Sequence, residues 1–63
     1  MGINRYLNEV QTAELLGVSV HTLRNWRFRR KNLKFIILGE RSIRYSLEDI
    51  VSFAESRKIE IDR

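Results

Sequence analysis

The chain has 63 residues, with 12 Lys and Arg against 8 Asp and Glu, one His and neither Cys nor Pro. This length suits one small domain, residues 1–63, in which disulfides and thiolate-bound zinc are excluded and a single histidine is too few for the usual zinc ligand sets. No segment approaches the roughly 20 apolar residues that span a bilayer and no signal segment is recognisable, so we expect a cytoplasmic protein without a membrane partner.

The first predicted helix covers Glu9–Leu16. Asn8 and Gln11 are spaced for a capping box, in which each side chain bonds the main-chain amide of the other. Gly17 follows as the residue that can end the helix in the left-handed conformation. The apolar residues that recur at helical spacing, and that we expect on the core face, are Val10, Ala13 and Leu16.

A second helix, about Val20 to Arg29, is predicted to begin almost at once, because the N-cap candidate Ser19 follows the first helix after two residues. Two short helices joined by so tight a turn cross steeply, which predicts a helix-turn-helix over about residues 9–30. At 100° per residue, one side of the second helix carries Leu23, Trp26 and Arg30, of which the first two are the expected core anchors.

A β-hairpin, or wing, is predicted over about residues 35–45, where two apolar runs rich in β-branched residues flank a Gly-containing turn. A three-residue loop, residues 39–41, is preferred because it gathers apolar side chains of both strands on one face. The resulting pairs are Leu38 with Ser42 and Ile36 with Arg44. The core-facing set is then Phe35, Ile37, Ile43 and Tyr45.

A third helix is predicted from Leu47 to about Lys58, with Ser46 as its N-cap and Glu48 and Asp49 at its positive end. Its apolar stripe is Leu47, Ile50, Val51 and Ala54, with Phe53 beside it. The expected core aromatics are Trp26, Phe35, Tyr45 and Phe53. Residues 59–63 are expected to fray, although their Ile-Glu-Ile alternation also suits a strand or a self-association contact.

Basic residues are concentrated from Arg24 to Lys34, where six of eleven residues are Lys or Arg and none is acidic. A solvated face normally mixes signs, so this cluster favours binding to a polyanion, with a purely solubilising role as the competing interpretation. Within a helix-turn-helix, the predicted polyanion is duplex DNA. The outer side of the second helix would enter the major groove and present His21, Arg24, Asn25, Phe28 and Lys31.

Side-chain chemistry suggests roles for these residues. Asn25 matches the donor and acceptor of adenine and is the leading candidate for base reading, whereas Arg24 suits either a guanine or a phosphate. His21 and Thr22 are candidates for phosphate or base contacts, with simple exposure and local capping as the competing interpretations. Phe28 either contacts a thymine methyl group or a base step, or folds back against the loop or the wing.

The remaining cations are predicted to hold the DNA backbone. Those of the second helix and the following segment are Arg27, Arg29, Arg30, Lys31 and Lys34. On the wing, Arg41 is placed to reach a minor groove and Arg44 to meet the backbone. About five neutralised phosphates would make log K fall with log salt at a slope near −4.5.

The order and spacing of short motifs resemble the small winged-helix domains of the MerR superfamily, in the excisionase and AlpA-like branch. The matching motifs are Tyr6-Leu7, the Ala13 to Ser19 stretch, Thr22 to Arg27, Leu38-Gly39 and Arg44 to Ile50 with Phe53. The resemblance implies a phage or mobile-element protein that occupies tandem DNA sites, bends DNA and assists an integrase or regulates transcription. It also implies DNA contacts for Arg24, Asn25, Arg27 and the 39–41 wing tip.

The chain departs from that family between the second helix and the first strand, where members commonly carry Gly and then Pro and this chain has neither. The helix could therefore run longer, or Asn32 could supply a left-handed turn. The long dimerisation helix of full MerR regulators is also missing, so no small-molecule effector is expected.

The leading prediction is a nucleoid-associated, sequence-specific duplex-DNA-binding protein that acts as an excisionase, with a transcriptional regulator as the nearest rival. One module buries roughly 600–1,000 Å² on DNA, so self-association on adjacent sites is expected. A different class is a protein-interaction module or inhibitor, which would use Ile36, Leu38 and the tail. An enzyme is not expected, since no cofactor, metal or catalytic constellation is recognisable. Single-stranded RNA binding is also disfavoured, because no strand carries the exposed pair of aromatic residues on which bases stack.

Overall fold

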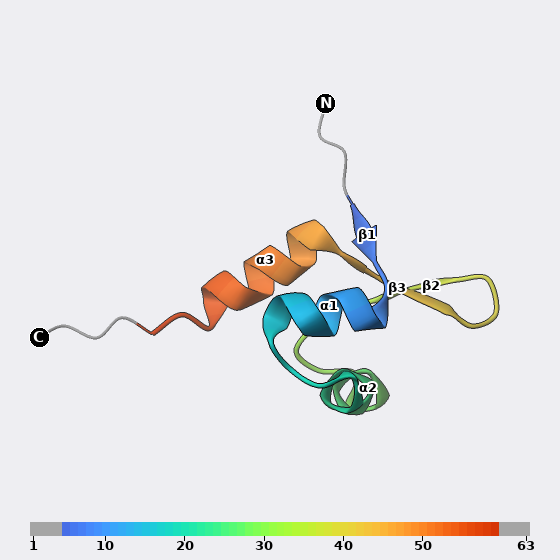
Figure 1. Cartoon of the computed structure of the whole chain (residues 1–63), viewed down its shortest axis with the longest axis horizontal. Coiled ribbons are helices and arrows are strands. Elements are labelled where there is room, and N and C mark those ends of the chain that lie inside the picture. Colours follow the sequence, from blue (N-terminus) through green and yellow to red (C-terminus); the bar gives the residue numbers. More distant parts are fainter. Residues whose placement is uncertain (1–4, 60–63) are drawn as a thin grey trace, which may run out of the picture.

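The computed structural model describes residues 5–59, which form three helices and a small antiparallel sheet (Figure 1). The protein is mainly α, with the winged helix-turn-helix architecture that the sequence predicts. In chain order the elements are β1 (Tyr6–Leu7), α1 (Glu9–Leu16), α2 (Val20–Arg29), β2 (Ile36–Leu38), β3 (Ser42–Ser46) and α3 (Leu47–Ser56).

The predicted capping box and Gly cap of α1 are confirmed. Asn8 Oδ1 accepts a hydrogen bond from the Gln11 amide at 2.8 Å, and Gln11 Oε1 accepts one from the Asn8 amide at 3.0 Å. Gly17 has φ 72°, and its amide donates back to the carbonyls of Ala13 and Glu14. Because this left-handed residue ends α1 sharply, α2 begins within three residues, at Val20.

The end of α2 decides between the two possibilities that the sequence left open. The helix stops at Arg29, and both Arg30 (φ 54°) and Asn32 (φ 72°) adopt left-handed backbone conformations. The prediction that Arg30 lies on the core side of the helix with Leu23 and Trp26 is therefore wrong, because Arg30 follows the helix end and is exposed. Two left-handed residues, neither of them Gly, thus provide the reversal of direction between α2 and β2.

The hairpin register is confirmed, with Leu38 opposite Ser42 and Ile36 opposite Arg44. The sheet, however, has a third strand that the sequence analysis missed. Strand β1 pairs antiparallel with β3 (Tyr6 opposite Ser46, Leu7 opposite Tyr45), so the strand order is β1-β3-β2. Two residues are too few to show a periodic pattern, and β1 forms only because β3, some 40 residues later, offers a free edge.

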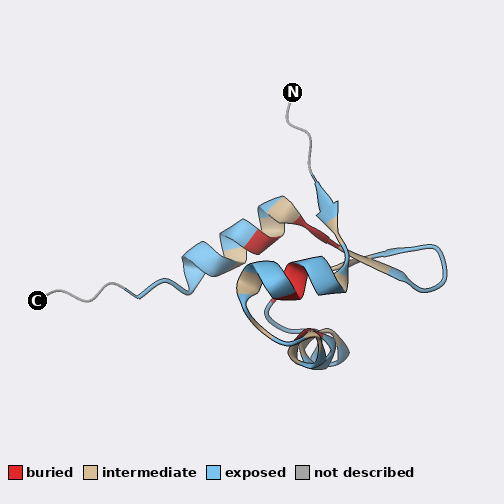
Figure 2. Ribbon diagram, in the orientation of Figure 1, coloured by how far each residue is buried: buried red, intermediate tan, exposed pale blue. Residues whose placement is uncertain are grey.

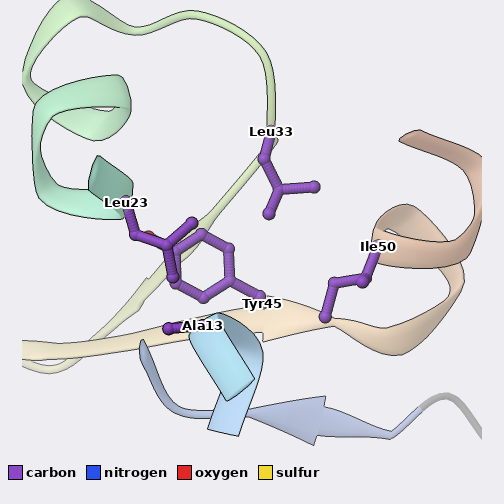
Figure 3. Close-up of a cluster of buried hydrophobic side chains, with 5 residues drawn as sticks. All are labelled: Ala13, Leu23, Leu33, Tyr45 and Ile50. Atoms are coloured by element: carbon purple, nitrogen blue, oxygen red, sulfur yellow. The ribbon is translucent and has the colours of Figure 1, made fainter. Parts of the chain in front are cut away.

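The core lies where α1, α2, β3 and α3 meet, and Figure 3 shows the Tyr45 ring between Leu23 and Ile50. Tyr45, Leu23 and Ile50 are at most 1% exposed, and Ala13 and Leu33 complete the cluster. At its edge Trp26 meets Phe53 edge-on, with ring centroids 5.5 Å apart. Arg57 lies over the same Phe53 ring, 5.2 Å from its centroid, and donates to Asn32 Oδ1 at 2.9 Å, which ties α3 to the turn after α2.

Four residues predicted on core faces are exposed, because the core is shorter than the elements around it (Figure 2). The hairpin projects past the helices, which leaves Ile37 57% exposed, and α3 extends beyond the core on the other side, which exposes Ala54. Val10 and Val51 lie at the sides of their helices and are also half exposed. In α1 the buried position is instead taken by Thr12, whose hydroxyl donates to the Asn8 carbonyl at 2.8 Å.

Helix α3 begins at its predicted cap, since Ser46 Oγ accepts from the Asp49 amide at 3.4 Å. It ends at Ser56, two residues before the predicted end, because Arg57 leaves the helical conformation (φ −101°, ψ 3°). Ile59 is 83% exposed, and the rest of the predicted tail, residues 60–63, lies outside the described residues. Within residues 5–59, none of the helices has the length and apolar character to span a membrane.

Candidate nucleic-acid interface

The outer face of α2, defined here as His21, Arg24, Asn25 and Phe28, is exposed as predicted. The opposite side of the helix fixes this orientation, because Leu23 is fully buried and Trp26 packs against the core. Figure 1 shows α2 end-on at the margin of the molecule, below α1. Phe28 is 88% exposed, so it does not fold back onto the loop or the wing, which was one of its two predicted placements.

A carboxylate that the sequence analysis did not single out sits against this face. Glu9 Oε2 accepts a hydrogen bond from Arg24 Nη2 at 2.7 Å, and Glu9 Oε1 accepts from Arg24 Nε at 3.3 Å. Arg27 Nη1 also donates to Glu9 Oε1, at 3.4 Å. The first residue of α1 therefore binds two arginines of α2, one of them bidentately.

The position of Glu9 follows from the helical geometry of α1. Counted at about 100° per residue, Glu9 falls on the same side as the buried Thr12 and Ala13, whereas Val10 falls outside that sector. Its side chain is consequently only 23% exposed. An acidic residue on the buried side of a helix that precedes an arginine-rich helix is the signal that could have identified this contact.

Arg27 connects the same group to the sheet. Its Nη1 donates to the Tyr45 hydroxyl at 3.0 Å as well as to Glu9, and its side chain is 21% exposed. We call Glu9, Arg24, Arg27 and Tyr45 the Glu9 cluster; it joins α1, α2 and β3. Arg27, expected to be a phosphate clamp, is thus directed mainly toward other protein groups, while the Arg24 side chain remains 61% exposed.

The electrostatics of the cluster favour the ionised forms. The hydrogen bond from Arg24, and then the charges of Arg24 and Arg27, lower the pKa of Glu9 below its ordinary 4.5, against an opposing effect of burial. The same hydrogen bond and charge raise the pKa of Arg24. Glu9 is therefore a permanent anion at neutral pH.

A cleft of 370 Å³ opens between the start of α1, α2 and the hairpin. Four arginines line it, together with one carboxylate, that of Glu9. Arg41 is exposed at the hairpin turn, whereas Arg44 is half-buried and donates from Nη1 to the Ile43 carbonyl at 2.8 Å. The structure thus brings the two wing arginines to the same cleft as Arg24 and Arg27, a convergence that their sequence positions did not reveal.

The other predicted clamps form a second group, which we call the turn cations: Arg29, Arg30, Lys31 and Lys34. All four side chains are exposed, and none forms an ion pair or side-chain hydrogen bond with another residue in the range 5–59. The left-handed residues at 30 and 32 place them around the end of α2. Their charges are available to a polyanion without the breaking of any internal contact.

Two further candidates near the start of α2 differ in their surroundings. The Thr22 hydroxyl lies 2.9 Å from Ser19 Oγ, and its amide donates to the same oxygen at 3.0 Å, so Thr22 belongs to the helix cap. His21 is exposed. Among residues 5–59, no group of three His, Cys, Asp or Glu side chains gathers as a metal site would require.

The arrangement can bind an extended anion with two chemically different surfaces. One is a planar, oriented arginine beside an amide and an aromatic ring, and the other is the set of lysines and arginines that are exposed and unpaired within residues 5–59. A family model described as a helix-turn-helix domain matches residues 6–58, which cover every helix and strand. No curated protein and no solved structure matches the chain.

Proposed function

The chain belongs to the helix-turn-helix domain family, and from this premise we propose that it binds duplex DNA sequence-specifically, with α2 in the major groove. The observation that carries the proposal is the exposed outer face of α2. It places an arginine, an amide and an aromatic ring at helical spacing, so that they project from one side of a helix whose other side is anchored in the core.

These side chains carry complementary recognition chemistry. Asn25 can bond the N6 and N7 of adenine, Arg24 the O6 and N7 of guanine, and Phe28 can cover the methyl group of thymine. The turn cations would hold one stretch of backbone, and Arg41 would reach toward the adjacent groove from the wing. Phosphate contacts of this kind fix the position of the protein, while base contacts select the sequence.

The finer proposal is an excisionase-like role, in which several copies occupy adjacent sites and bend the DNA so that an integrase assembles. The resemblance of the motifs from Tyr6 to Phe53 supports this role, as does the small contact area available to one module. On a duplex with tandem sites we expect stepwise gel shifts, and in a recombination assay we expect excision by the cognate integrase to be stimulated. Binding and repression without stimulation would favour a transcriptional regulator.

A second candidate function rests on the exposed apolar surface of the hairpin. Ile37 and Leu38 are 57% and 50% exposed on an edge strand, which suits a protein partner. Lys31→Glu with Lys34→Glu separates the two functions, because both side chains are exposed and neither forms an ion pair within residues 5–59. Retention of activity by this double variant would identify a protein-interaction module.

The proposal is tested by selection from a pool of duplexes with a randomised core, followed by titration of an enriched duplex over a salt series. We expect enrichment of defined sequences and a log K against log salt slope near −4.5, for about five neutralised phosphates. The matching single strand serves as the control and should bind more weakly. Failure to enrich any sequence, or affinity that salt does not change, would contradict duplex reading.

A further inference from the structure

Resting on the proposed function, we propose that Glu9 is a positioning residue that directs Arg24 to a guanine base instead of the DNA backbone. No part of the Glu9 side chain needs to contact DNA for this role. It acts through the bidentate pair that it forms with Arg24 across the junction of α1 and α2.

The geometry of the pair leaves one edge of the guanidinium free. Arg24 uses Nε and Nη2 toward Glu9, which occupies the side-on edge of the planar group. The guanidinium has five N–H donors in a rigid fork, so the end-on edge, with Nη1, remains available. That edge can donate two parallel hydrogen bonds, the pattern that guanine O6 and N7 accept in the major groove.

Glu9 can orient Arg24 because Glu9 itself is held firmly. It is the first residue of a helix with a complete capping box, its side chain is 23% exposed, and Arg27 binds its second oxygen. Arg27 is in turn fixed by the Tyr45 hydroxyl, and Tyr45 is 1% exposed. The orientation of Arg24 is therefore fixed relative to the core through Glu9, Arg27 and Tyr45. Part of the conformational entropy of the Arg24 side chain is thus lost before DNA binds.

The charge of Glu9 has the opposite effect on backbone binding. A carboxylate in a cleft lined by four arginines neutralises part of the positive field and repels phosphate. Glu9 should thus weaken sequence-independent binding while it strengthens the choice of guanine. A residue with a purely structural role would change both kinds of binding in the same direction.

The test measures binding of the full chain to a duplex enriched from the random pool. The Arg24→Ala variant first identifies the position at which the wild-type preference for guanine over adenine depends on Arg24. We expect Glu9→Gln to lower the guanine preference about 5- to 10-fold, a fraction of what a bidentate Arg–guanine pair supplies. The same variant should bind a scrambled duplex about 2- to 5-fold more tightly, because it removes one negative charge beside the backbone.

Three controls separate geometry from charge and from folding. Glu14→Gln makes the same charge change in α1 at an exposed residue that forms no ion pair with residues 5–59, and should leave the guanine preference unchanged. Glu9→Asp keeps the charge but withdraws the carboxylate by one methylene, and should lower the preference without tighter binding to the scrambled duplex. In the Arg24→Ala background, Glu9→Gln should change the preference no further. Thermal unfolding of each variant reports the folded fraction.

The outcomes distinguish this inference from the function on which it rests. If the wild-type chain enriches no duplex, both are overturned. If it enriches a duplex but no guanine depends on Arg24, or if Glu9→Gln leaves the guanine preference intact, the inference alone is overturned. A parallel loss of affinity for the enriched and scrambled duplexes, with a lowered melting temperature, would assign Glu9 a structural role and also overturn it.

Discussion

The two arginines of the Glu9 cluster and the turn cations are only a few positions apart in the sequence, yet they have opposite surroundings. Arg24 and Arg27 are bound to Glu9, and Arg27 also to Tyr45. The turn cations, Arg29 to Lys34, are exposed and make no side-chain contact of this kind with the described residues. The difference is one of position along α2, because Arg24 and Arg27 lie within the helix toward α1 and the hairpin, whereas the turn cations begin at its last residue, Arg29, and continue into the following turn.

The comparison shows that local charge density alone does not assign function to a basic residue. An arginine held by a carboxylate has a fixed plane, and can recognise a partner of matching geometry at little further entropic cost. A free lysine or arginine is a mobile charge suited to phosphate, wherever the phosphate lies. One short basic segment can therefore supply both selectivity and affinity, from different residues.

The largest expected effect separates Arg24 from Lys31 on DNA. Arg24→Ala should remove about 1–3 kcal/mol of discrimination at one base pair, because it deletes a bidentate base contact. Lys31→Ala should weaken binding to all duplexes alike and reduce the salt slope by about 0.9, because it deletes a phosphate contact. Titrations of enriched and scrambled duplexes at several salt concentrations measure both quantities. An equal loss of discrimination in the two variants would erase the distinction.

Next in size is the stability of the Arg27 contacts. Arg27→Ala leaves the Tyr45 hydroxyl and Glu9 short of a partner in a half-buried site, so we expect the free energy of unfolding to fall by about 1–2 kcal/mol. For a domain of this size that lowers the melting temperature by roughly 4–8 °C for each kcal/mol. Arg29→Ala is the matched control and should stay within about 0.5 kcal/mol of wild type.

Tyr45→Phe sharpens the same prediction, because it removes only the hydroxyl that Arg27 Nη1 bonds at 3.0 Å. In a double-mutant cycle with Arg27→Ala, the two changes should be less than additive. Full additivity would show that the contact contributes nothing to stability.

A smaller effect concerns Phe28, the exposed aromatic residue between the two basic sets. If its ring covers a thymine methyl group, replacement of that thymine by uracil should weaken binding by about 0.8 kcal/mol, which is the typical free energy of burying one CH₂-sized apolar group. The Phe28→Ala variant should be insensitive to the same replacement. Sensitivity that persists in Phe28→Ala would assign the methyl contact to another residue.

The smallest expected effect is the pH dependence of the Glu9 pairs. The folded pKa of Glu9 lies below its ordinary 4.5, so its stabilising contribution is complete above that pH and is lost as the pH falls through the lowered folded value. Partly exposed ion pairs contribute about 0.2–1 kcal/mol. In urea unfolding, the free energy of unfolding of wild type should therefore exceed that of Glu9→Gln by this amount at pH 7. The difference should shrink below pH 4.5. A difference that grows in acid would contradict the assigned ion pairs.

Local sequence signals predicted much of the fold. The caps Asn8, Gly17, Ser19 and Ser46 fixed the helix starts and one helix end, because each acts on backbone groups within four residues. The three-residue turn fixed the hairpin register in the same way. Features that depend on distant partners were not predicted, namely strand β1 and the burial of Leu33. Exposure of Ile37 and Val51 was also missed, since periodicity shows which residues share a face but not how far the core extends along it.

The candidate site, like the fold, was predictable where it depends on local sequence and not where it depends on contacts between distant residues. The outer face of α2 follows from counting residues around a helix whose anchors, Leu23 and Trp26, are recognisable. The Glu9 cluster was not found, because it depends on how closely α1 crosses α2 and on the 18-residue separation of Glu9 and Arg27. Orientation of the turn cations likewise required the left-handed backbone of Arg30, for which the sequence offers no Gly.

The central claim is that the outer face of α2 reads duplex DNA, and backbone amide shifts of the ¹⁵N-labelled chain, titrated with an enriched duplex, test it most directly. The claim predicts the largest shifts at His21, Arg24, Asn25 and Phe28, smaller ones around the turn cations and Arg41, and little change at Val51 and Glu55 on α3. A scrambled duplex should shift the turn cations more than the outer face. Shifts centred on Ile37 and Leu38, or on α3, with the outer face unmoved, would contradict the claim.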